Sequence, residues 1–347
     1  MFALFPSTVF LLSGCVSQYS LLSAGNSYGT SYSVVVSKNT YAEKSWRAVA
    51  DALVSKHGAQ LVFYEGGVAG AREVLTATMP RYTAFVARPE ECGQDYIADI
   101  HLLVRQLDED PWEDTQWGII TGNDAAGALR IALVSAPHEI KKTQLGALTE
   151  KRGKSAQDLT PVAICNFPAC ALVNAAQRPH AAEGINQIAA YADATSLGRS
   201  SKGMLDIWQT LPGRNSFSES FFLNQQWMLH ELAGLRQEVD ASAFYGDPAW
   251  RVTLDSPEEP AFVSTGLMSA GSEHTFRIEI NNRMMAAQNT TPIGTLFTMR
   301  LKNVKIISGW EYEPVVADNF ILLFKPVPQG QEKEIVVKFS GEPVREK

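Results

Sequence analysis

The stretch from Leu159 to Glu183 contains the residue types from which a thiol enzyme could be built. It holds Cys165, Cys170 and His180. A cysteine nucleophile acts as its thiolate, so it needs a histidine to take the proton and backbone N–H groups to hold the oxyanion. A short apolar run predicts a strand over Pro161–Cys165, which would place the Cys165 thiol at a strand end. The sequence therefore offers a Cys165–His180 dyad as a candidate catalytic site.

Other interpretations of these residues remain open. His138, one element before Cys165, could serve as the base in place of His180. Cys165 and Cys170 could instead be packed thiols or form a local disulfide. No second Cys/His pair completes a zinc site around them, and neither GxGxxG nor GxxxxGK[ST] occurs in the chain. We therefore predict neither a metal nor an organic cofactor.

Composition excludes some classes of protein. The chain has 347 residues, which is long for one domain, and its 45% hydrophobic and 19% charged residues are typical of a globular protein. The net charge is −7, and no basic stripe is present. Because nucleic-acid binding depends on clustered Lys and Arg, we expect no nucleic-acid partner.

The first fifteen residues form a short apolar run that ends in Leu12-Ser13-Gly14-Cys15. Small residues before a cysteine are typical of a lipoprotein signal peptide, in which Cys15 would be acylated and become the mature N-terminus. Residues 17–30 would then be the tether. This pattern predicts a membrane-anchored lipoprotein of the cell envelope; the alternative is a frayed hydrophobic end.

From Tyr32 onward, apolar strands alternate with amphipathic helices. A strand over Tyr32–Ser37 is followed by a helix over Ala42–His57, with Thr40 as its cap and Gly58 as its end. The alternation continues with strands over 60–64, 83–87 and 117–121 and helices over 69–77 and 94–107. This order predicts βαβ units, and hence a parallel sheet with helices on both faces. The loops 37–39, 65–67, 88–90 and 121–124 should gather at one edge, where sites on such sheets lie.

The second half of the chain changes character. Asp124–Val134 favours a helix capped by Asp124, and Ser216–Leu235 predicts a long helix on which His230 is a surface or packing residue. Residues 250–345 alternate apolar and polar side chains between turn residues, which predicts an antiparallel immunoglobulin-like sandwich. The predicted domains are a signal and tether over 1–30, an α/β domain over 31–250 and a sandwich over 251–347.

Several segments between Tyr32 and Trp250 resemble the gingipain-type branch of the clan CD, caspase-like cysteine peptidases. The matching segments are VVVSKNTYAEKSW, FVARPEECGQDYIADIHLLVRQLDEDPWEDTQWGIITGNDAA, RPHAAEGINQIAAY, PGRNSFSESFFLNQQ and AFYGDPAW. The resemblance implies a caspase-like, mostly parallel sheet flanked by helices, followed by the immunoglobulin-like module. It also implies descent from a cysteine peptidase.

Two departures from the family pattern suggest that activity is lost. His180 matches the catalytic histidine of the family, but Pro179 stands where the family has a glycine. In the family the nucleophilic cysteine follows that histidine, whereas here no cysteine follows Cys170, as if the cysteine-bearing strand were deleted. The resemblance thus implies a degenerate homologue that binds a peptide or protein ligand, or acts as a scaffold. The alternative is an active cysteine peptidase or hydrolase that uses Cys165 and His180.

Overall fold

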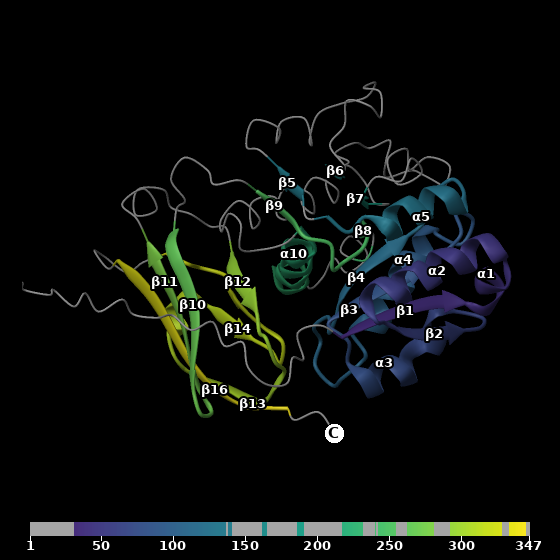
Figure 1. Cartoon of the computed structure of the whole chain (residues 1–347). Coiled ribbons are helices and arrows are strands. Elements are labelled where there is room, and N and C mark those ends of the chain that lie inside the picture. The colour runs from purple at the N-terminus through teal and green to yellow at the C-terminus, as the bar shows by residue number, and fades with distance from the viewer. Residues whose placement is uncertain are drawn as a thin grey trace, which may run out of the picture.

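The computed structural model describes residues 31–136, 138–140, 162–164, 186–190, 217–231, 240, 242–254, 262–280, 292–327 and 333–344. One sheet organises the first part of the chain (Figure 1). Its strands, in spatial order, are β2 (Gln60–Tyr64), β1 (Tyr32–Ser37), β3 (Tyr82–Val86), β4 (Gln116–Ile120), β8 (Ser242–Tyr245), β7 (Asn186–Ala190) and β6 (Val162–Ile164).

The first five strands in that order run parallel, and β7 runs antiparallel to β8. The predicted mostly parallel sheet is therefore confirmed. Strands β1 and β4 are buried along their whole length. Continuous apolar runs of this kind are expected where helices cover both faces of a parallel sheet.

Helices cover the two faces as the alternation of side chains along each strand requires. Val34 points toward α2 (Lys44–His57) and α5 (Ala125–Leu133). Its neighbour Val35 points the other way. That second face is covered by η2 (Val68–Ala71), α3 (Arg72–Thr78), α4 (Gln94–Val104) and α10 (Phe217–Glu231). None of the helices in the described part of the chain has the length and apolar character needed to cross a bilayer.

The helix ends show where local sequence signals succeed and fail. The predicted cap at Thr40 is wrong, because Thr40 lies inside the short helix α1 (Lys38–Ala42) and its N–H donates to the Ser37 side chain at 3.0 Å. Glu43, with an extended backbone, separates α1 from α2. Gly58 ends α2 in the left-handed region at φ 60°, as predicted. Asp124 caps α5 by accepting a hydrogen bond from the Gly127 N–H at 2.8 Å, also as predicted.

Two antiparallel sheets make up the C-terminal part. One contains β10 (Phe262–Ala270), β11 (Glu273–Ile280), β16 (Glu334–Pro343) and β13 (Leu301–Ser308), and the other contains β12 (Ile293–Leu296), β15 (Phe320–Leu323) and β14 (Pro314–Val316). Phe276 and Val337 of the first sheet share a core with Ile293 and Ile321 of the second. The predicted β-sandwich is confirmed. A short helix, η6 (Trp310–Tyr312), lies between β13 and β14 and contributes Tyr312 to the sandwich core. Outside the sandwich, β5 (His138–Ile140) pairs with β9 (Val252–Leu254).

Helix α10 joins the sheet to the sandwich. Phe221 packs into the core beneath the parallel sheet, whereas Phe222 and Leu223 pack against Phe320 and Leu322 of β15. Figure 1 shows α10 between the two parts. A helix with apolar contacts on several sides must be buried, and α10 is buried along most of its length.

Candidate functional site

The sequence-predicted dyad falls outside the described residues. Cys165, Cys170 and His180 lie there, as does Cys15, so the dyad and the lipidation site stay predictions. Strand β6 ends at Ile164, directly before Cys165, as the predicted strand required. His138, the alternative base, belongs to β5, which lies in a different sheet from β6.

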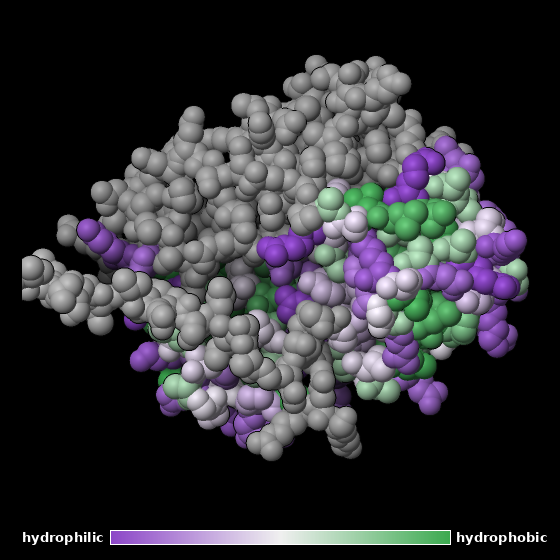
Figure 2. Space-filling model, viewed as in Figure 1, coloured by the Kyte–Doolittle hydropathy of each residue, from purple (hydrophilic) through white to green (hydrophobic). Residues whose placement is uncertain are grey.

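The described residues contain a pocket at the edge of the sheet where strands β1 and β2 end. Its volume is about 320 Å³. It is lined by Ser37, Lys38, Asn39, Tyr64, Glu65, Gly66, Gly67, Val68, Glu91, Tyr96 and Asp99. Residues 37–39 and 65–67 were expected at this edge, and the pocket confirms that they lie together. Residues 88–90 and 121–124, expected at the same edge, do not line it. Figure 2 shows many hydrophilic side chains at this end of the molecule, around α1.

Glu91 holds the base of the pocket together. Its carboxylate accepts hydrogen bonds from Ser37 Oγ at 3.1 Å, Thr40 Oγ1 at 2.6 Å and the Arg88 N–H at 2.8 Å. These bonds tie the end of β1 and the start of α1 to the segment after β3. Because its oxygens already accept these hydrogen bonds, Glu91 gives the pocket negative charge and rigidity but is not a free group for binding a ligand.

The outer part of the pocket is charged and adjustable. Lys38 Nζ lies 2.8 Å from Glu65 Oε1, and the two side chains are 59% and 70% exposed. An exposed ion pair of this kind contributes roughly 0–1 kcal/mol, so a ligand can displace it. Asp99 is also exposed. The charged residues of the lining are three carboxylates and one ammonium group, so the lining is net negative: Glu65, Glu91, Asp99 and Lys38.

Two tyrosines form an aromatic wall. The Tyr64 hydroxyl donates to Tyr96 Oη at 3.4 Å. Burial raises the pKa of Tyr64 to about 12, although the hydrogen bond to Tyr96 opposes this shift. Burial likewise raises the pKa of Tyr96 well above its ordinary value. Both phenols are therefore neutral at physiological pH. The Tyr64 hydroxyl is used in the bond to Tyr96, so Tyr96 is the phenol that can donate to a ligand, and both rings offer apolar surface.

The pocket lining contains no cysteine or histidine. Of the cysteines, only Cys92 lies within the described ranges, and its side chain is 0% exposed in the core beneath the sheet. A thiol nucleophile must reach its substrate, so Cys92 is a packing residue. The chemistry that this pocket supports is binding by charge, hydrogen bonds and aromatic contact.

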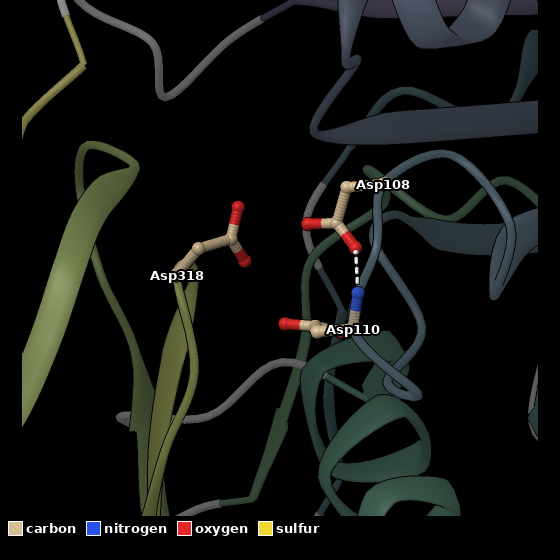
Figure 3. A group of neighbouring side chains, drawn as sticks. All are labelled: Asp108, Asp110 and Asp318. Atoms are coloured by element: carbon tan, nitrogen blue, oxygen red, sulfur yellow. Dashed lines mark hydrogen bonds between the residues drawn. The ribbon is translucent and has the colours of Figure 1, made fainter.

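A group of carboxylates at the junction with the sandwich has the spacing of a metal site (Figure 3). Oxygens of Asp108, Asp110 and Asp318 lie within 4.8 Å of one another. Arg300, however, forms an ion pair with Asp318, and its Nη1 lies 4.0 Å from Asp108 Oδ2. A guanidinium group already supplies positive charge here, so we assign no metal to the cluster.

The FYGDPAW segment has a structural role. Asp247 is 1% exposed and accepts hydrogen bonds from the Tyr32 hydroxyl at 3.0 Å, Lys56 Nζ at 2.7 Å and His57 Nε2 at 2.7 Å. Burial acts to raise the pKa of Asp247, but His57 and Lys56 outweigh it, so the pKa is lowered. The carboxylate thus ties the end of α2 and the start of β1 to the segment after β8. Sequence reasoning singled out this segment but not its partners.

Comparison with known proteins gives structural similarity alone. No protein-family model matches the chain, and no curated protein matches it in sequence. The crystal structure of the Arg specific cysteine proteinase gingipain R (RGPB) aligns at 10% identity and a TM-score of 0.42, over 91% of this chain and 98% of that chain. The complex of Porphyromonas gingivalis RgpB pro- and mature domains aligns at 11% identity and the same TM-score of 0.42, over 91% and 100%.

Proposed function

We propose that this protein is a degenerate gingipain-like cysteine-peptidase homologue that binds a peptide or protein ligand without cleaving it. The observation that carries the proposal is the pocket of about 320 Å³ at the ends of β1 and β2, lined by carboxylates and tyrosines and by no cysteine or histidine. Ligands of open α/β sheets bind at this edge. The order of residues in the sequence supports the loss of catalysis, since no cysteine follows His180.

The charges of the pocket indicate which ligands it favours. Its net negative lining attracts a positively charged group, and the neutral rings of Tyr64 and Tyr96 can pack against an aliphatic stem or a cation. Lys38 can leave Glu65 to make room, because their ion pair is exposed. We therefore expect a basic peptide segment to bind better than a neutral or acidic one.

The test is a binding titration of the full chain with fluorescent peptides of matched length that are basic, neutral or acidic. The basic peptide should bind most tightly, and Asp99→Asn should weaken it roughly fivefold to tenfold, about 1 to 1.4 kcal/mol. Glu342→Gln, which changes an exposed carboxylate in the sandwich, is the matched control. Equal binding of all three peptides would contradict the proposal that this pocket is the binding site for a basic peptide.

The N-terminus supplies the proposed location. Acylation of Cys15 would anchor the protein to a membrane of the cell envelope through lipid. Expression of the full chain in a bacterial host, followed by detergent phase partitioning, tests this. The wild-type protein should enter the detergent phase. The Cys15→Ser variant, which cannot be acylated, should stay in the aqueous phase, whereas Cys170→Ser should behave like the wild type.

A second candidate function is an active cysteine peptidase or hydrolase with Cys165 as nucleophile and His180 as base. It is favoured by one observation, the end of β6 at Ile164 immediately before Cys165. Labelling with an iodoacetamide probe across pH, followed by mass mapping, separates the two functions. Fast labelling of Cys165 well below the free-thiol pKa of roughly 8.5, abolished by His180→Ala, would establish the enzyme. Labelling with the pH profile of an ordinary thiol supports the binding protein.

A further inference from the structure

A small cavity lies where the parallel sheet meets the sandwich. Its volume is about 20 Å³. Arg81 and Gln116 line it from the sheet side, at the starts of β3 and β4, and Asp114 lies two residues before β4. Asn319 lines it from the sandwich, directly before β15. The cavity is thus bounded by the two parts of the molecule together.

Each of these four residues has one buried polar atom without a hydrogen-bond partner in the part of the chain that the structure describes. The atoms are Arg81 Nε, Gln116 Nε2, Asp114 Oδ2 and Asn319 Oδ1. Buried polar groups are nearly always paired, with protein or with ordered water. Four such atoms around one cavity therefore call for a shared ligand.

The remaining polar atoms of the four residues are engaged, which fixes what each presents to the cavity. Asn319 Nδ2 donates to the Asp114 carbonyl at 3.2 Å, so the oxygen of that amide is the end left over. Gln116 Oε1 accepts from Ser218 Oγ at 3.1 Å, which leaves its amide nitrogen. Asp114 Oδ1 accepts from Arg300 Nη1 at 2.7 Å. Arg300 also lines the cavity, but its Nη1 and Nη2 already donate to Asp114 and Asp318. Burial raises the pKa of Asp114 to about 8, and Arg300 opposes this shift, so Asp114 Oδ2 is an acceptor when the carboxyl group is ionised. The unpaired atoms at the cavity are then two N–H donors and two oxygen acceptors.

These unpaired donors and acceptors indicate which ligand the cavity can bind. A water molecule accepts two hydrogen bonds and donates two, and it needs roughly 10–15 Å³ of cavity volume. A cation would face the Arg81 guanidinium and the Gln116 N–H groups, and an anion would face the Asp114 carboxylate. We propose that the cavity binds a single structural water that accepts from Arg81 and Gln116 and donates to Asp114 and Asn319.

This water would lie at the junction between the parallel sheet and the sandwich. It bridges the sheet side to Asn319 of the sandwich, beside a direct bond in which Arg81 Nη1 donates to the Phe297 carbonyl at 3.0 Å. It exchanges slowly with bulk solvent, because its four partners are buried.

Water ¹⁷O magnetic relaxation dispersion on the full-length protein measures such long-lived waters. Gln116→Met keeps the side-chain volume but removes the donor, so the amplitude should fall by the contribution of one water. Gln60→Met, at an exposed position on β2, is the matched control and should leave the amplitude unchanged. Circular dichroism confirms that each variant is folded. If Gln116→Met does not fold, Gln116→Glu replaces the donor with an acceptor and should lower the amplitude in the same way.

A high-resolution crystal structure of the wild type gives the second readout. A peak within hydrogen-bonding distance of all four atoms, refining as water, supports the proposal. An amplitude unchanged in both Gln116 variants, an empty cavity, or a peak too strong for water would overturn it.

Discussion

At the scale of single residues, Asp247 shows how one carboxylate can hold together segments that are far apart in the sequence. Its side chain is 1% exposed and is paired with Lys56 and His57. Removal of one partner from a buried ion pair costs more than the pair contributes, because a desolvated charge is left behind. Replacement of Asp247 should therefore be among the more damaging substitutions outside the apolar core.

We expect Asp247→Asn to lower the free energy of unfolding by roughly 3 kcal/mol at pH 7. The pKa of Asp247 is lower in the folded than in the unfolded protein, so its contribution is present above about pH 4 and is lost as the pH falls further. Urea unfolding at pH 7 and pH 3 measures both effects, and the difference between wild type and variant should shrink at pH 3. Asp51→Asn, at an exposed carboxylate that accepts from Tyr41, is the control and should change stability by less than about 0.5 kcal/mol.

The pKa of Asp110 is shifted in the opposite direction to that of Asp247, so its effect on stability changes with pH in the opposite sense. Burial raises the pKa of Asp110 to about 7, the Trp112 N–H opposes this shift, and the neighbouring Asp108 and Asp318 add to it. The folded state therefore holds a proton that the unfolded chain gives up near pH 4, and stability is lost as the pH rises from about 4 toward 7.

Asp110→Asn retains the carbonyl oxygen that accepts from Trp112 and removes the charge. We predict a higher melting temperature than the wild type at pH 8 and a smaller difference at pH 4. Thermal unfolding at the two pH values checks this. A variant that is less stable than the wild type at pH 8 would show that the ionised carboxylate is needed, for example as a partner of Arg300.

At the scale of elements, α10 is the piece on which the packing depends most. Phe222 is 2% exposed and meets the ring of Phe320 edge-on, with centroids 5.9 Å apart. We predict that Phe222→Ala lowers the free energy of unfolding by roughly 3–5 kcal/mol, because it leaves a cavity between helix and sandwich. Phe63→Ala, at a phenylalanine that is 39% exposed on β2, is the control and should cost clearly less. Equal losses in the two variants would mean that α10 is not tightly packed against β15.

Local sequence signals predicted the elements well where the structure depends on nearby residues. Strand β2 has the predicted bounds, Gly58 ends α2 and Asp124 caps α5. The break at Glu43 was missed because it depends on the capping of α1 by Ser37. Strand β7 was not predicted at all, since its pairing with a strand more than fifty residues away leaves no local pattern.

The candidate pocket could be predicted in part. Loops that follow parallel strands must share an edge, which placed Lys38 and Glu65 together. Tyr96 and Asp99 were not predicted, because they reach the pocket from α4 and only the packing of that helix places them there. Pairings between the α/β part and the sandwich, such as Asp114 with Arg300, depend on tertiary structure alone.

At the scale of the whole molecule, the sheet and the sandwich are joined by buried polar contacts as well as by α10. Arg300 is 3% exposed, and its Nη1 donates to Asp114 Oδ1 at 2.7 Å across the junction. The Asp114 side chain is itself 2% exposed. Because the two parts share buried charges and an apolar interface, we expect the wild type to unfold in a single cooperative transition, with equal calorimetric and van't Hoff enthalpies. An aggregating or partly unfolded wild type would instead indicate a decaying gene product.

Burial raises the pKa of Asp114 to about 8, and Arg300 opposes this shift. Arg300→Met therefore tests this coupling directly at pH 9, where it leaves an ionised Asp114 buried without its cation. The free energy of unfolding should fall by roughly 3–5 kcal/mol, and the calorimetric enthalpy should exceed the van't Hoff enthalpy as the two parts begin to melt separately. Arg277→Met removes an ion pair whose two side chains are each 43% exposed, so it should cost about 1 kcal/mol or less and keep the single transition. The double variant Arg300→Met with Asp114→Leu should recover part of the loss, since it removes the Asp114 carboxylate and leaves Asp318, whose side chain is 20% exposed, as the carboxylate without its ion-pair partner. If the double variant is no more stable than Arg300→Met, the lost free energy of unfolding arises from packing at the junction and not from the unpaired Asp114 carboxylate.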